Sequence, residues 1–127
     1  MKQNNEINIL ILEDEELVRV ILEDYLQGYD YKIFSFETGS QALSAMSSED
    51  FHVAIVDMNT PDMDGNEFIL EVHKINPSCK FIIHTGSMGE NLSDSLREIG
   101  MEDCDILIKP VDDMELFISA INRLINK

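Results

Sequence analysis

The chain has 127 residues, of which 44% are hydrophobic, and this suits one globular domain with its own core. Its 25 acidic and 9 basic side chains give a formal charge of −16. That charge repels nucleic acid and anionic lipid, so we expect this domain to bind neither. No apolar run approaches the ~20 residues of a membrane span, and the start lacks a signal peptide. We therefore expect a cytoplasmic protein with Cys79 and Cys104 as reduced thiols.

Short apolar runs alternate with amphipathic stretches along the chain. The predicted strands are 7–12, 31–36, 52–56, 80–84 and 105–108. The predicted helices are 15–27, 38–47, 64–76, 91–99 and 112 to the C-terminus. Gly28 is expected to end the first helix, and Thr38-x-x-Gln41, Asp64-x-x-Glu67 and Asp112-x-x-Glu115 to open three others. Because strands that alternate with helices imply crossovers, we predict an α/β fold: a doubly wound parallel sheet covered on both faces.

Polar side chains follow four of the five predicted strands. They are Glu13-Asp14 after the first strand, Asp57 after the third, Thr85 at the end of the fourth and Lys109 after the fifth. In an open parallel sheet, ligands bind beyond the carboxyl ends of the strands. The sequence therefore predicts that three carboxylates, a hydroxyl and an ammonium group meet at one edge of the sheet.

This set of side chains suits phosphoryl transfer. Carboxylates this close raise each other's pKa, and Lys109 offsets only one of the charges. Mg²⁺ prefers one or two carboxylates together with waters and a phosphate oxygen. Asp57 would then be the nucleophile that forms an aspartyl phosphate, while Thr85 and Lys109 would hold other phosphoryl oxygens.

The sequence resembles the receiver domain of two-component response regulators. The resemblance rests on Glu13-Asp14, Asp57 in D-x-x-x-P-x-M-D-G, Thr85-Gly86 and Lys109-Pro110, and it extends over essentially the whole chain. It implies a flavodoxin-like sheet of order 2-1-3-4-5 with five helices. We expect one receiver domain over 1–127, with no output domain in this chain.

The resemblance also implies a role for each matching residue. The roles are Asp57 as phosphoacceptor, Thr85 as switch hydroxyl, Lys109 as the family's lysine, and Glu13, Asp14, Asp57 and the backbone carbonyl of Asn59 as ligands of Mg²⁺ or Mn²⁺. The donor would be a histidine kinase or a histidine phosphotransfer protein. Phosphorylation would switch an unknown downstream protein or a covalently linked output domain. Such a domain catalyses its own phosphorylation and dephosphorylation, but it acts mainly as a signalling switch.

Two other functions remain open at this point. One is an interaction module that keeps the fold without using phosphate, which Ile106 favours slightly because the family usually has Tyr or Phe there. The complete set of site residues argues against that reading. The other is a phosphatase or a flavin-binding protein. It is disfavoured because the acidic run 13–16 would repel a cofactor phosphate and because Asp57 does not begin an Asp-x-Asp motif.

Several further residues have two interpretations. Asp62 and Asp64 are interpreted as a turn residue and a helix N-cap in preference to metal ligands, and His84 as a strand residue in preference to a catalyst. Apolar residues cover about half of the first helix, against the ≳100° stripe that a core needs, so the helix has either a wide core face or a surface that docks a partner. These residues are Leu17, Val18, Ile21, Leu22, Tyr25 and Leu26, and Val20 lies outside even that arc.

Two expectations concern the backbone near the site. The Lys109–Pro110 bond is predicted to be cis, because a strand that ends on an inward-facing lysine must turn sharply. Activation is expected mainly as a rearrangement of 86–92, where two glycines relax the backbone, with little change at Ile106.

Overall fold

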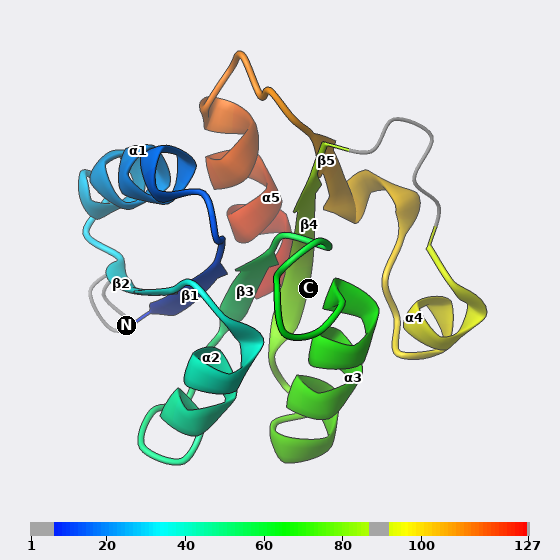
Figure 1. Cartoon of the computed structure of the whole chain (residues 1–127). Helices are drawn as coiled ribbons and strands as arrows, with labels where there is room; N and C mark the ends of the chain where they lie inside the picture. The colour runs from blue at the N-terminus through cyan, green and yellow to red at the C-terminus, as the bar shows by residue number, and fades with distance from the viewer. Residues whose placement is uncertain (1–6, 87–91, 127) are drawn as a thin grey trace.

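One five-stranded sheet forms the centre of the molecule in the computed structural model, which describes residues 7–86 and 92–126 (Figure 1). Its order is β2-β1-β3-β4-β5, and all neighbouring strands are parallel. The strands are β1 (Asn8–Leu12), β2 (Lys32–Phe36), β3 (Val53–Val56), β4 (Lys80–Thr85) and β5 (Ile106–Ile108). The predicted fold class and strand order are confirmed.

Helices cover both faces of this sheet, as predicted. They are α1 (Glu16–Gln27), α2 (Gly39–Ala45), α3 (Gly65–Ile75), α4 (Asp94–Glu98) and α5 (Glu115–Ile125). Helices α1 and α5 pack on one face, where Leu22 and Phe117 are buried (Figure 1). Helices α2, α3 and α4 pack on the other face, around the buried Phe68 and Leu96.

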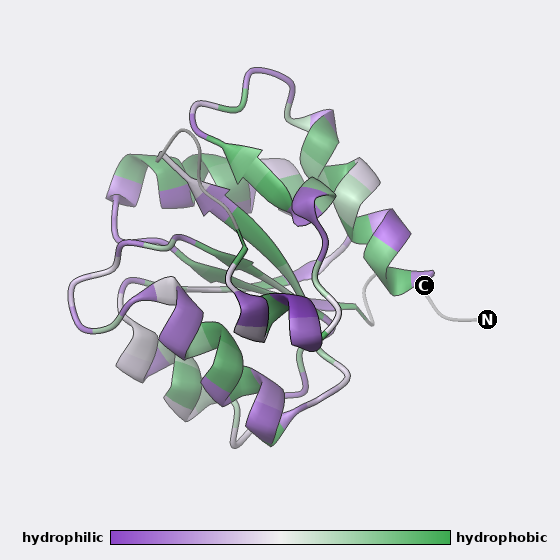
Figure 2. Ribbon diagram, turned by 90° about the vertical axis from the view of Figure 1, so that its right-hand side faces the viewer, coloured by the Kyte–Doolittle hydropathy of each residue, from purple (hydrophilic) through white to green (hydrophobic). Residues whose placement is uncertain are grey.

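The central strands are buried on both sides. In β1, Leu10 and Leu12 belong to the core under α2, α3 and α4, whereas Ile9 and Ile11 belong to the core under α1 and α5. Figure 2 shows apolar residues along the sheet and polar residues on the outer helix surfaces. Burial of each such side chain contributes about 1.5–3 kcal/mol before the entropy of folding is counted. This double burial explains why the strands read as continuous apolar runs.

The predicted helix starts are correct at α3 and partly correct at α2. Asp64 is the N-cap of α3, and its side chain accepts a hydrogen bond from the Glu67 N–H at 2.8 Å. Thr38 likewise caps α2 by accepting from the Gln41 N–H at 3.2 Å. The Gln41 side chain reaches back to the backbone N–H of Glu37, one residue before the cap.

The boundaries of α4 and α5 differ from the prediction. Helix α4 is shorter than 91–99, because Ser93 is its N-cap and accepts from the Leu96 N–H. Helix α5 begins at Glu115, not at Asp112, and the side chain of Asp113 accepts the Glu115 N–H. These polar side chains bind orphan backbone donors later in the chain than the motif spacing suggested.

Strand β5 is also shorter than predicted. A 3₁₀ turn, η2 (Asp103–Asp105), replaces its first residue, and the Asp105 side chain accepts a hydrogen bond from the Glu102 N–H at 2.8 Å.

Within the described ranges, no helix is long and apolar enough to cross a membrane. The thiols of Cys79, which is buried, and Cys104, which is exposed, are both free of disulfides.

Candidate functional site

The sheet itself aligns the candidate site residues. Leu12 pairs with Val56 across β1 and β3, and the N–H of Asp57 donates to the Leu12 carbonyl at 2.9 Å. On the other side of the sheet, the N–H of Lys109 donates to the Thr85 carbonyl at 2.7 Å. The ladder therefore continues one residue beyond the strand ends and holds these residues at one edge.

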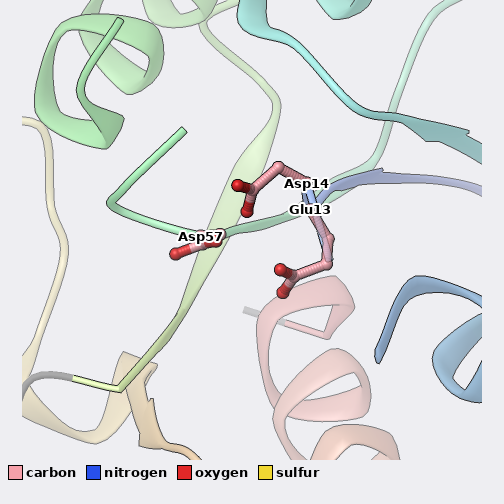
Figure 3. A group of neighbouring side chains, drawn as sticks. All are labelled: Glu13, Asp14 and Asp57. Atoms are coloured by element: carbon pink, nitrogen blue, oxygen red, sulfur yellow. The ribbon is translucent and has the colours of Figure 1, made fainter. Parts of the chain in front are cut away.

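Three carboxylates meet at this edge, as Figure 3 shows. Oxygen atoms of Glu13, Asp14 and Asp57 all lie within 4.8 Å of one another. Glu13 and Asp57 are buried, and Asp14 is half-buried. Burial, followed by the nearby Asp57 carboxylate, raises the pKa of Asp14 above its ordinary value. The predicted cluster of carboxylates is therefore present.

The ammonium group of Lys109 lies between the carboxylates. Its Nζ is 2.9 Å from Glu13 Oε1, 3.4 Å from Glu15 Oε1 and 3.6 Å from Asp57 Oδ2. Burial opposes its charge, but the surrounding carboxylates outweigh burial and raise the pKa of Lys109. One positive charge therefore compensates several negative ones. The peptide bond between Lys109 and Pro110 is cis, as predicted.

Glu13 is poorly satisfied for a buried carboxylate. It is 1% exposed, and no described residue gives Oε1 a well-directed hydrogen bond, although Lys109 lies within ion-pair distance. Its other oxygen accepts the N–H of Glu15 at 3.2 Å. Loss of water on burial, only partly offset by Lys109, raises the pKa of Glu13 to about 7.

His84 lies beside this carboxylate on the opposite side of the strand from Thr85. Its Nδ1 is 3.9 Å from Glu13 Oε1, and its ring packs edge-on against Phe117 with centroids 5.1 Å apart. Burial, followed by the charge of Lys109, lowers the pKa of His84 to about 4, so the ring is neutral near pH 7. His84 is a buried residue of β4, in line with its interpretation as a strand residue.

The donor set suits a hard divalent cation. A buried carboxylate oxygen without a hydrogen bond from the described residues, and three carboxylates opposite one lysine, leave negative charge that a cation would neutralise. Asp14 and Asn59 also line a hollow of about 400 Å³ next to the cluster. The residues present therefore fit Mg²⁺ or Mn²⁺.

The remaining predicted residues lie close to this cluster. Thr85 is fully buried at the end of β4. The N–H of Asn59 donates to Asp57 Oδ1 at 3.1 Å, which fixes the orientation of that carboxylate. The segment predicted to rearrange, 86–92, falls mostly on 87–91, which lie outside the described residues. Ile106 is half-buried and packs against the core that includes α4.

Sequence reasoning missed the contacts that Asp62 makes with the start of α2. Its carboxylate accepts hydrogen bonds from the N–H groups of Gly39 and Ser40, both at 2.9 Å, and from the Ser40 hydroxyl at 2.7 Å. Asp62 therefore caps α2 from a distant loop instead of acting only as a turn residue. These bonds, above all the hydroxyl bond, lower the pKa of Asp62. The contact spans 22 residues, so no local pattern announces it.

The contact between Glu15 and Lys109 was also missed, although the acidic run 13–16 draws attention to the region. The two residues are 94 positions apart, and only the fold brings them together.

The same edge of the molecule exposes part of α1. Leu22 and Leu26 are buried in the core, whereas Leu17 is 73% exposed, and Val20 and Ile21 are exposed as well. The helix therefore has both a core stripe and an exposed apolar ridge, which is Leu17, Val20 and Ile21.

Comparisons with known proteins give a consistent result. The sequence model described as "Response regulator receiver domain" matches residues 9–122. A probable chemotaxis protein CheY of Rhizobium etli is 32% identical over 121 residues, covering 91% of this chain and 92% of that protein. The transcriptional regulatory protein ZraR of Klebsiella oxytoca is 30% identical over 108 residues, which are 84% of this chain. The chain matches only 24% of the length of that regulator.

A solved structure shows the same fold over almost the whole chain. The response regulator TrrA of Thermotoga maritima, in complex with Mg²⁺ and BeF, has a TM-score of 0.79 and 25% sequence identity. The match covers 93% of this chain and 98% of that one.

Proposed function

We propose that this chain, which belongs to the response regulator receiver domain family, takes a phosphoryl group from a phosphohistidine onto Asp57. The modified domain would then switch the binding of a partner. One observation carries the proposal: a buried aspartate at a strand end, with Lys109 Nζ 3.6 Å from one of its oxygens and two more carboxylates beside it. An interaction module without phosphate would not need that arrangement.

Mg²⁺ or Mn²⁺ would be held by Asp14, Asp57 and the backbone carbonyl of Asn59, with Glu13 acting through water. When bound, the cation supplies positive charge against the phosphoryl oxygens. Support comes from the unsatisfied Glu13 oxygen and from the Mg²⁺ complex of the similar TrrA structure.

Asn59, Lys109 and Thr85 would position the reacting groups. The Asn59 N–H holds Oδ1 of Asp57 and leaves Oδ2 on the side of Lys109. An Asp57 oxygen forms the new O–P bond as the P–N bond of the phosphohistidine breaks, and the imidazole leaves with the electron pair and takes a proton. Lys109 and the Thr85 hydroxyl would each hold a phosphoryl oxygen, because both follow strands that end beside Asp57.

The exposed apolar ridge of α1 supports docking of the phosphodonor. Helix α1 follows directly after Glu13 and Asp14, so a kinase or phosphotransfer protein that covers the ridge would also cover the site. Leu17, Val20 and Ile21 are each at least 47% exposed, which is unusual for neighbouring large apolar side chains. The output stays open: the chain spans about a quarter of the ZraR regulator, so a linked output domain is one proposal and a separate protein is another.

Phosphate incorporation tests the proposal. Acetyl phosphate with Mg²⁺ should add one acid-labile acyl phosphate to the wild type, and Asp57→Asn should abolish the addition because an amide does not attack phosphorus. Asp62→Asn is the matched control, since it changes the same residue type in the same loop and should retain incorporation. Intact-protein mass spectrometry measures both variants. Undiminished labelling of Asp57→Asn would exclude Asp57 as the main acceptor.

Unfolding experiments test the cation separately. Millimolar Mg²⁺ should raise the thermal midpoint of the wild type, because a ligand that binds only the folded state stabilises it. Asp14→Asn should lose most of this rise. Equal midpoints with and without Mg²⁺ in the wild type would contradict the proposed site.

A further inference from the structure

Glu15 has an unusual position at the start of α1. It is the N-cap residue of the helix, yet its side chain makes no capping hydrogen bond. The carboxylate instead contacts Lys109 Nζ at 3.4 Å, while its backbone N–H donates to Glu13 Oε2. Glu15 is therefore fixed to the site at both its backbone and its side chain.

Lys109 has to divide its donors among three carboxylates. Two of its neighbours, Glu13 and Asp57, are buried, whereas the side chain of Glu15 is 64% exposed. An ammonium group has three N–H donors, and that of Lys109 already faces three carboxylates. A phosphoryl oxygen that approaches Asp57 therefore competes with Glu15 for Lys109.

Glu15 also places charge at the mouth of the site. Its Oε1 is no more than about 7 Å from Asp57 Oδ2, because Lys109 Nζ lies 3.4 Å from one and 3.6 Å from the other. At such a distance in water, a unit charge changes the free energy of bringing up a second unit charge by an amount equivalent to about a 1.5- to threefold change in rate, depending on the salt concentration. The effect is larger for a dianion than for a monoanion.

We propose that Glu15 determines donor specificity at this site: its carboxylate draws Lys109 away from Asp57 and repels small anionic phosphodonors. A protein donor that covers the exposed Glu15, and pairs its charge, would remove both effects. The inference rests on the proposed phosphorylation of Asp57. In each reaction an Asp57 oxygen forms the O–P bond, and the donor's P–O or P–N bond breaks with its electron pair leaving on acetate or, after protonation, on ammonia.

The test compares two small donors of different charge. Acetyl phosphate is a dianion near neutral pH, whereas phosphoramidate has a net charge of −1. Glu15→Gln keeps the length of the side chain and an oxygen that can accept from Lys109, but removes the charge. It should raise the initial rate of phosphate incorporation about fivefold with acetyl phosphate and about twofold with phosphoramidate, and high salt should reduce both ratios toward one.

Two matched variants separate charge from structure. Glu16→Gln removes a neighbouring exposed charge that makes no ion pair within the described ranges, and should change either rate less than twofold. Glu15→Asp keeps the charge and should retain the wild-type difference between donors. Urea unfolding should give the same midpoint for Glu15→Gln and the wild type, which excludes a general structural effect.

The outcomes are distinguishable. Equal rates for Glu15→Gln and the wild type with both donors, or the same increase in Glu16→Gln, would overturn the role of Glu15 and leave phosphorylation intact. A wild type that takes up no phosphate on Asp57 from either donor would overturn the proposed function itself, and the inference with it.

Discussion

Two buried carboxylates at opposite ends of the sheet have very different surroundings. Glu13 follows β1 at the carboxyl end, and Asp105 precedes β5 at the amino end; both are 1% exposed. Asp105 binds the Arg123 guanidinium at 2.9 Å and the Glu102 N–H at 2.8 Å. Glu13 has Lys109 at 2.9 Å, but no well-directed hydrogen bond from the described chain reaches its Oε1.

The difference shows that burial alone does not identify a functional carboxylate. A buried charge with complete hydrogen bonds ties elements together, and Asp105 joins η2 to α5 in this way. A buried carboxylate oxygen that has an ion pair but no well-directed hydrogen bond raises the free energy of the folded state, and this arrangement is typical of sites that bind a further group. Satisfaction of hydrogen bonds, and not depth, separates the two ends of the sheet.

The largest effect is expected at the satisfied carboxylate. Asp105→Ala removes the Arg123 ion pair and leaves the Glu102 N–H without its side-chain acceptor. We expect the free energy of unfolding to fall by about 3 kcal/mol in urea titrations at pH 7, the lower end of the range for broken buried pairs, because the Arg123 side chain is 39% exposed. A loss below 1 kcal/mol, the range of an exposed pair, would remove the basis of the comparison.

The second effect concerns pH at the unsatisfied carboxylate. The pKa of Glu13 is about 7 in the folded state against an ordinary 4.5. Between these values the folded state binds more protons than the unfolded state, so this group's contribution to stability falls as pH rises and is fully lost above about pH 7. Glu13→Gln lacks this loss. As pH rises from 4.5 to 7.5, the free energy of unfolding of the variant should increase by about 2–3 kcal/mol relative to that of the metal-free wild type.

The wild type measured with EDTA, which removes divalent cations, is the reference for that measurement. His84 has the opposite dependence, because its lowered pKa, about 4, makes stability fall as pH drops below its ordinary 6.5. His84 is present in both proteins, so its own dependence on pH cancels to first order in the difference between them. A difference that is constant from pH 4.5 to 7.5, measured in urea with EDTA, would show that Glu13 is as well satisfied as Asp105.

A third, smaller effect is expected at Asp62, which is exposed but fully hydrogen-bonded at the same end of the sheet as Glu13. Asp62→Ala removes three acceptor contacts from the start of α2. Amide hydrogen exchange should show lost protection in the first turn of α2, with α3 and α5 unchanged. Asp64→Ala is the matched control and should weaken the start of α3 instead, because Asp64 caps that helix.

The smallest effect tests an exposed pair near Asp105. Arg97 and Asp103 form a 2.7 Å ion pair between α4 and η2, with side-chain exposures of 46% and 75%. Asp103→Ala should change the free energy of unfolding by about 0.5 kcal/mol or less, because water and salt screen such pairs. A loss comparable to that of Asp105→Ala would mean that η2 depends on its charges as a network.

The sequence was sufficient for the element order and for the gathering of the charged groups at one edge of the sheet. Apolar runs that alternate with amphipathic stretches predicted the doubly wound sheet, because both faces of the strands must be buried. Residues at the ends of parallel strands meet at one edge whatever the details of packing, so the proximity of Glu13, Asp14, Asp57 and Lys109 was predictable from their positions.

Local signals failed where polar side chains bind distant partners. The starts of α5 and β5 were placed too early, because Asp113 and Asp105 bind backbone donors that the motif spacing did not indicate. The two interpretations of α1 could not be separated, since the width of an apolar face does not show how much of it a neighbour covers.

The sequence by itself determined which charged groups gather at the carboxyl edge of the sheet, because chain order and strand polarity fix that edge. Only the tertiary structure decided how each group is satisfied. It joins Asp62 to the start of α2, Glu15 to Lys109 and Asp105 to Arg123, and it leaves Glu13 short of a hydrogen bond from the described residues. Hydrogen bonds depend on distances and angles of fractions of an ångström between segments far apart in the chain, and hydrophobic periodicity does not encode them.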